Sequence, residues 1–262
     1  MARYPGRLLV VVDACQLRCS REQIRADLHA GFMVIMTGSK FAGGPPFAGA
    51  LLLPPWIVQW PQSVKLPQGL FAYTAANDRP LALRERLKGG FVATANLGMG
   101  LRWEAALAEL ERLFALDSAL RARVTARFSQ LVCEHASSSS RFDLVDRYHG
   151  DGDIKQRTIF PIVACDGNGM PLAADVMQRA LRRPFRAGIA GVPGRVFHVG
   201  QPVAVGNRSA VRVCLGAPEI TGVGKRMRAG QGFDAAFAPL AADVADLFGK
   251  WTYLASLPFQ PG

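Results

Sequence analysis

The hydrophobic residues at the start of the chain fall into short continuous runs rather than an alternating pattern. Leu8 to Val12 forms one run, and Phe32 to Met36 and Ala48 to Leu53 form two more. Continuous runs of this length are typical of strands that are covered on both faces in a parallel sheet. Between the first two runs, Ser20-Arg21-Glu22-Gln23 reads as a capping box and predicts a helix that ends near Gly31. A strand, a helix and a strand in this order predict an α/β fold.

The pattern changes after residue 100. From Leu101 to about Glu134 the apolar spacing predicts two helices, with Asp117 as the N-cap of the second. Farther on, the chain alternates predicted strands and helices: strands at Arg157 to Ala164, Val196 to Val199 and Ala210 to Leu215, a turn at Gly150 to Asp153, and helices at Pro171 to Arg183 and Asp234 to Leu257. We therefore expect part of a large α/β domain, with part of a mostly parallel sheet, at residues 1–100, a helical connection at 101–140 and a small α+β domain at 141–262.

The composition indicates a globular protein. Of the 262 residues 50% are hydrophobic and 19% are charged, which suits one or two domains and excludes extended disorder. No apolar stretch approaches the roughly 20 residues of a membrane span, and the first residues lack an apolar signal core. The five cysteines are scattered and odd in number, so we expect free thiols, no disulfide framework and no metal site. Together these features predict a soluble, cytoplasmic protein.

The net charge of +11 raises the question of a nucleic-acid partner. The arginines are distributed along the predicted helices and form no single basic run. We interpret them as solvated helix faces and expect neither nucleic acid nor a membrane as a partner. Of the possible functions, basic nucleic-acid binding is the least favoured.

Two charged residues follow the first two predicted strands. Asp13 comes after the first apolar run and Lys40 after the second, in the region where ligands of α/β sheets bind. Singly, Asp13 is best explained as a turn or cap residue and Lys40 as a surface charge. Jointly they suit pyridoxal phosphate, because a carboxylate keeps its pyridine nitrogen protonated and a lysine amine holds its aldehyde as an imine.

Around these two residues the sequence resembles the aminotransferase class V and cysteine desulfurase group of fold-type I pyridoxal phosphate enzymes. The matching stretches are VVVDACQ, from Val10 to Gln16, and TGSKFAGGPPFAGALLLP, from Thr37 to Pro54. The resemblance implies that Asp13 pairs with the pyridine nitrogen and that Lys40 carries the cofactor as a Schiff base. It further implies that Gln16 donates to the ring hydroxyl oxygen, that Thr37 and Ser39 bind the phosphate, and that the enzyme is a homodimer.

Arg212 is flanked by apolar residues in a predicted strand, where an unpaired charge is costly. Because the local sequence resembles a substrate-binding position of the same group, we expect Arg212 to bind the carboxylate of an amino acid. The alternative is a strand whose polar face meets solvent. His198 and Gln201 lie near another predicted strand end and are further candidates for the substrate pocket, although a hydrogen-bonded structural histidine is the commoner case.

The resemblance covers only part of the expected site. Fold-type I enzymes have a glycine-rich phosphate turn and a ring-stacking residue well upstream of the aspartate, whereas twelve residues precede Asp13. We expect a carboxyl-terminal portion of such an enzyme, with the upstream half of the large domain missing or supplied by a partner. Cys165 and Cys214 are expected inside strands and not exposed, which favours an aminotransferase-like reaction on an amino acid or amine over desulfuration or another lyase reaction. The rival interpretation is a non-catalytic or degenerate protein of this fold that acts by binding or dimerisation.

Overall fold

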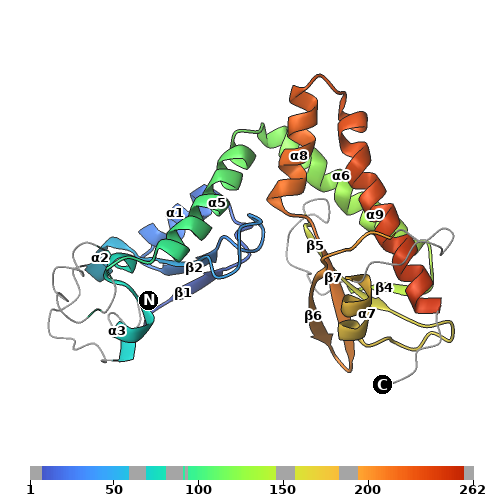
Figure 1. Ribbon diagram of the computed structural model, residues 1–262, viewed down its shortest axis with the longest axis horizontal. Helices are drawn as coiled ribbons and strands as arrows, with labels where there is room; N and C mark the ends of the chain where they lie inside the picture. The colour runs from blue at the N-terminus through green and yellow to red at the C-terminus, as the bar shows by residue number, and fades with distance from the viewer. Residues whose placement is uncertain are drawn as a thin grey trace. The chain divides into compact units, whose positions relative to one another are not determined.

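The computed structural model describes residues 8–58, 69–80, 91, 94–145, 157–182 and 194–256 (Figure 1). The chain divides into two compact units, residues 1–112 and residues 113–262. Each unit contains helices and one small sheet, so the fold is α/β in the broad sense. No helix in the described ranges is long and apolar enough to cross a membrane.

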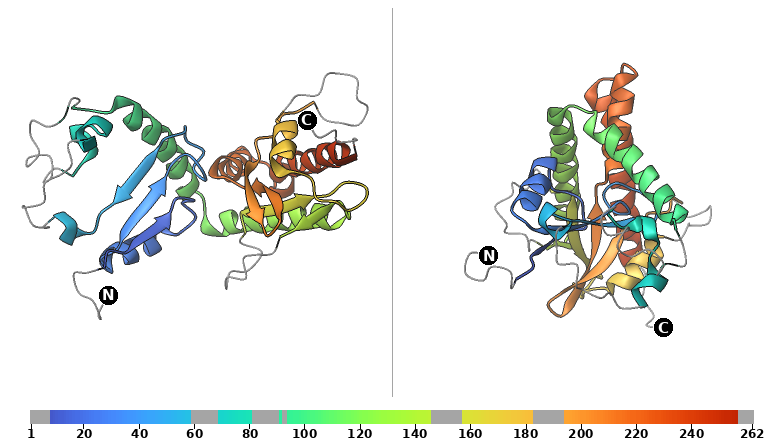
Figure 2. Two further views of the ribbon diagram at one scale, coloured as in Figure 1. Left: turned by 90° about the horizontal axis from the view of Figure 1, so that it is seen from below. Right: turned by 90° about the vertical axis from the view of Figure 1, so that its left-hand side faces the viewer.

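The first unit is built around a three-stranded sheet with the order β1-β2-β3 (Figure 2). Strands β1 (Val11–Ala14) and β2 (Met33–Thr37) pair in parallel, and helix α1 (Arg21–His29) connects them. Strand β3 (Gly49–Leu52) runs antiparallel to β2, so the described sheet is mixed rather than mostly parallel. The β2–β3 connection is too short for a crossover, which parallel pairing requires.

The N-cap of α1 forms at Ser20 as predicted, but the capping box is not completed, because the Gln23 side-chain amide donates to Asp27 Oδ1 at 3.0 Å. The Ser20 hydroxyl accepts a hydrogen bond from the Gln23 amide at 3.1 Å, and Gly31 follows the helix with a φ of +85°. Other helical segments among the described residues of this unit are α2 (Pro55–Val58), α3 (Gly69–Tyr73) and a 3₁₀ turn, η1 (Ala76–Asp78).

The two faces of the first sheet are unequally covered. Val34 is fully buried on one face, whereas Val11, Ile35 and Leu51 on the other are 45%, 38% and 48% exposed. Cross-strand register places Asp13, Ile35 and Leu51 in one row on that open face. We use the name open apolar row for the three exposed apolar residues of this face, Val11, Ile35 and Leu51. A parallel strand pair is normally covered on both sides, so this row is an unusual feature.

Two long helices follow. Helix α5 (Leu97–Phe114) starts four residues before the predicted helix, because the Asn96 side chain caps it by accepting from the Met99 amide at 2.9 Å. Helix α6 (Ser118–Ser137) has Asp117 as its N-cap, as predicted; the carboxylate accepts from the Ala119 amide at 2.6 Å.

The second unit has a four-stranded antiparallel sheet with the order β4-β5-β7-β6. Its strands are β4 (Phe142–Leu144), β5 (Ile159–Ala164), β6 (Gly200–Val205) and β7 (Arg208–Cys214). Helices α7 (Ala174–Leu181), α8 (Ala217–Arg228) and α9 (Phe233–Ser256) complete the unit. Its core includes the fully buried Trp251 and Phe160.

Several sequence predictions for this unit need correction. Val196–Val199 is not a strand; the strand begins at Gly200, where the backbone first pairs with β7. Helix α8, which contains Gly222 and Gly224, is not predicted from the sequence. Gly224 allows α8 to pack closely against Leu116, since a Cβ at position 224 would lie 2.4 Å from Leu116 Cδ2. The turn predicted at residues 150–153 lies outside the described residues.

Candidate functional site

Asp13 lies in β1 on the open face of the first sheet, and its carboxylate is held by the turn that follows. One oxygen, Oδ1, accepts a hydrogen bond from the Cys15 backbone amide at 2.9 Å. Each carboxylate oxygen can accept more than one hydrogen bond, so Asp13 can also accept from a ligand while it is bonded to Cys15. The turn continues to Leu17, a non-glycine residue with a φ of +50° whose amide donates to Ala14 O at 2.7 Å.

The charge state of this carboxylate is set by its neighbours. Hydrogen bonds from the Cys15 thiol and amide lower the pKa of Asp13, and the positive charge of Lys40 also lowers it, while desolvation acts in the opposite direction. Conversely, the hydrogen bond to Asp13, burial and the Asp13 charge raise the pKa of the Cys15 thiol, while Lys40 lowers it. Lys40 therefore lies within electrostatic reach of both Asp13 and Cys15.

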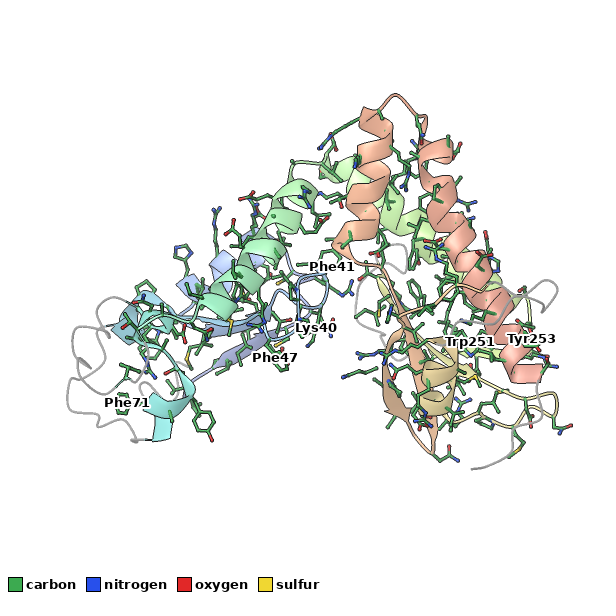
Figure 3. The ribbon with its side chains drawn as sticks, viewed as in Figure 1. Lys40, Phe41, Phe47, Phe71, Trp251 and Tyr253 are labelled. Atoms are coloured by element: carbon green, nitrogen blue, oxygen red, sulfur yellow. The ribbon has the colours of Figure 1, made fainter. Side chains whose placement is uncertain are left out.

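Lys40 lies in the loop that follows β2 (Figure 3). The Gly38 amide donates to Ala48 O at 2.8 Å, and the Gly44 amide donates back to Gly38 O at 2.9 Å. The Gly43 amide closes a turn on Lys40 O at 3.0 Å, with a φ of +68° that favours glycine. The loop is thus folded back on itself, and Lys40 is exposed at its bend.

Two glycines of the same loop are required by helix packing. A Cβ on Gly38 would lie 2.5 Å from Ala106 Cβ in α5, and one on Gly44 would lie 2.8 Å from the same atom. Ala42, Ala48 and Ala106 are fully buried around this contact. The glycine-rich part of the loop therefore has a structural explanation that does not require a ligand.

The other three residues predicted to bind the cofactor, Thr37, Ser39 and Gln16, differ in whether their side chains already make a hydrogen bond. The Thr37 hydroxyl donates to Cys15 O at 2.8 Å, which ties β2 to the turn after β1. A phosphate bound by Thr37 would have to replace that bond, because a hydroxyl donates only one hydrogen. Ser39 and Gln16 are half-buried and make no side-chain hydrogen bond within the described part of the chain, so Ser39 is the better phosphate donor of the two hydroxyls.

The predicted substrate residues belong to the second unit. Arg212 is half-buried in β7, and its Nε donates to Gln201 O at 2.8 Å. Gln201 thus contacts Arg212 through its backbone, and its side chain is exposed, as is His198. Cys165 is buried, as expected, but Cys214 is exposed, contrary to expectation, because it ends β7 beyond the covered part of the strand.

Sequence reasoning missed two features near Lys40. Cys15 is not among the residues predicted for the site, although its position between Asp13 and Gln16 is a signal that the sequence offers. Phe47 has a φ of +68° and is 80% exposed, a costly conformation for a large side chain. No sequence signal marks it.

A groove of about 590 Å³ lies along α6 in the second unit, beside the start of α9. Its lining includes Arg123, Arg127 and Phe233 and none of the predicted site residues. This groove therefore does not support the cofactor assignment. We compared the chain with protein-family models, with curated proteins and with solved structures, and none of them matches it.

Proposed function

We propose that this chain is a cytoplasmic pyridoxal phosphate-dependent enzyme, or the carboxyl-terminal portion of one, that acts on an amino acid or amine in an aminotransferase-like reaction. One observation carries the proposal. Asp13 of β1 and Lys40, in the loop after the parallel strand β2, lie close enough for the Lys40 charge to contribute to the lowered pKa of Asp13. This is the pair that the resemblance to fold-type I enzymes implies.

The residues of this site fit the cofactor chemically. When bound, pyridoxal phosphate supplies an electron sink for negative charge at the substrate α-carbon. Asp13 would hold the proton on the pyridine nitrogen, because an aspartate is charged at neutral pH and the pKa of this one is lowered further. The Lys40 amine would bind the aldehyde carbon and later move the α proton as a general base. Arg212 would orient the substrate carboxylate through its guanidinium.

A partner is part of the proposal. The open apolar row lies in the same face as Asp13, and a covering layer would both bury it and shield the cofactor. We expect this layer, and the rest of a mostly parallel sheet, from a second copy or from a polypeptide that corresponds to the upstream half of fold-type I enzymes. The same row favours the second candidate function, a non-catalytic protein of this fold that acts by binding or dimerisation.

Desulfuration stays the less favoured reaction. The exposure of Cys214 removes one argument against it, since an accessible thiol is what that reaction needs. However, Cys214 is part of strand β7 rather than of a loop, so it lacks the freedom to move toward a substrate.

The test is reduction of the imine. Incubation with pyridoxal phosphate followed by borohydride should add the mass of one reduced cofactor per chain, and peptide mapping should locate it on Lys40. Lys40→Ala should abolish the adduct, whereas Lys225→Ala, which removes an ammonium from the second unit, should leave it unchanged. An absent adduct, with or without a co-expressed partner, or one that survives Lys40→Ala, would contradict the proposal.

A further inference from the structure

The orientation of Arg212 depends on the strand beside it. Gly200 of β6 is the register partner of Arg212, and the pairing is irregular from there to Val203. The Arg212 Nε donates to Gln201 O at 2.8 Å. Its two terminal nitrogens make no hydrogen bond or ion pair within the described part of the chain, so they are available for a bidentate contact with a carboxylate.

Gly200 provides the space in which the Arg212 side chain lies. A Cβ at position 200 would be 2.9 Å from Arg212 Cβ, 3.2 Å from Arg212 O and 3.3 Å from Arg212 Nε. Non-bonded carbon atoms prefer separations of about 3.5–4.0 Å. A side chain at this position would therefore push against the Arg212 Cβ and crowd the Nε that fixes the guanidinium.

The strand cannot easily move away, because other side chains hold its start. The Gln178 amide of α7 donates to Gly200 O at 2.8 Å. Farther back, the fully buried Lys250 of α9 donates to Arg195 O at 2.6 Å and to Leu181 O at 2.9 Å. The segment from Arg195 to Gln201 is thus anchored to two helices.

We propose that Gly200 is a positioning residue, which sets the direction of the Arg212 guanidinium and thereby the preference for substrates that carry a carboxylate. The inference rests on the role of Arg212 in the proposed function. Gly200 itself touches no substrate; it acts through the space it leaves.

The first experiment observes the Arg212 guanidinium directly. In the full chain, the Nε–Hε resonance of Arg212, assigned by its loss in Arg212→Lys, is titrated with propionate and with the neutral analogue propionamide. We expect propionate alone to shift it saturably. Gly200→Ala should move the resonance and weaken propionate binding by about tenfold or more, the loss expected when a charged hydrogen bond is misaligned.

Two further variants keep the test decisive. Gly249→Ala is the matched control, because a Cβ there meets nothing within 4 Å, and it should titrate like the unmodified chain. If Gly200→Ala does not fold, Gln178→Met decides, since it removes the hydrogen bonds to Val199 O and Gly200 O that hold this strand in place, and so changes the space beside Arg212 without adding volume at Gly200. It should weaken propionate binding in the same direction. Unchanged propionate binding in Gly200→Ala, or in Gln178→Met where Gly200→Ala is unfolded, overturns the inference.

The propionate experiment can succeed or fail independently of the test of the proposed function. If no reducible imine forms on Lys40 but Gly200→Ala weakens propionate binding, the cofactor proposal fails and the positioning role stands. If the imine forms and Gly200→Ala binds propionate normally, the positioning role fails alone. With an active enzyme, Gly200→Ala should raise KM for an amino acid more than for the corresponding amine without a carboxylate.

Discussion

At the scale of single residues, Asp13 and Cys15 determine each other's charge. The hydrogen bond between them stabilises the carboxylate and disfavours the thiolate, so the pKa of Asp13 falls and that of Cys15 rises. Lys40 favours the anionic form of both groups. Three side chains from two strand ends are therefore coupled, and the coupling can be measured on the thiol.

We predict that Asp13→Asn increases the rate at which iodoacetamide alkylates Cys15 at pH 8. Removal of the carboxylate charge lowers the raised pKa of Cys15, so a larger fraction is thiolate at that pH. Lys40→Gln should have the opposite effect. Each change should be roughly a few-fold, since one pKa unit alters the thiolate fraction about tenfold.

Alkylation is followed by peptide mapping, with the exposed Cys214 of the second unit as the internal reference. Equal Cys15 rates in the unmodified chain and both variants would mean that Lys40 and Asp13 do not act on a common site. That result would also remove the main support for the cofactor proposal.

At the scale of elements, the loop after β2 is held by its contact with α5. Gly38 and Gly44 face Ala106, and the Trp103 indole donates to Gly49 O at 3.1 Å. The helix therefore fixes the loop that carries Lys40 through small residues, which leave no room for a methyl group.

We predict that Gly38→Ala lowers the free energy of unfolding by about 1–3 kcal/mol, because its Cβ would overlap Ala106 Cβ. Gly49→Ala is the control; a Cβ there meets nothing within 4 Å, and the change should stay within about 0.5 kcal/mol. Ala106→Gly should recover part of the loss in a double variant, measured by urea denaturation. If Gly38→Ala and Gly49→Ala are equally stable, the described packing is wrong.

At the scale of the whole molecule, the predicted cofactor residues and the predicted substrate residue belong to different compact units. The first contains Asp13 and Lys40 beside the open apolar row, and the second contains Arg212. Exposed apolar side chains grouped on one sheet face are typical of an interaction surface.

We predict that Ile35→Lys combined with Leu51→Lys reduces binding of the hydrophobic dye 8-anilinonaphthalene-1-sulfonate. The unfolding free energy should change by less than about 1 kcal/mol, because both side chains are already 38–48% exposed. Val34→Lys is the contrast, since it places a charge where the side chain is fully buried, and it should unfold the first unit. A double variant that unfolds like Val34→Lys would show that the row is covered in the chain itself.

The sequence by itself determined the features that depend on neighbours along the chain. Ser20 and Asp117 cap their helices because the acceptor and the amide are only two or three residues apart. Continuous apolar runs mark β2 and β3, whereas the run from Leu8 to Val12 overlaps only the first two residues of β1, which continues to Ala14. The sequence also determined that Asp13 and Lys40 lie near the ends of two successive strands. It led to the cofactor hypothesis, which the pattern alone does not test.

Only the tertiary structure decided features that depend on residues far apart in the sequence. The antiparallel pairing of β3, the start of β6 at Gly200 and the open apolar row all follow from which strand lies beside which. Likewise, Gly38 is required by Ala106, and Gly200 by Arg212. These positions need glycine because a Cβ would collide with a residue that is distant in the sequence. Such contacts between distant segments form only when the chain is folded.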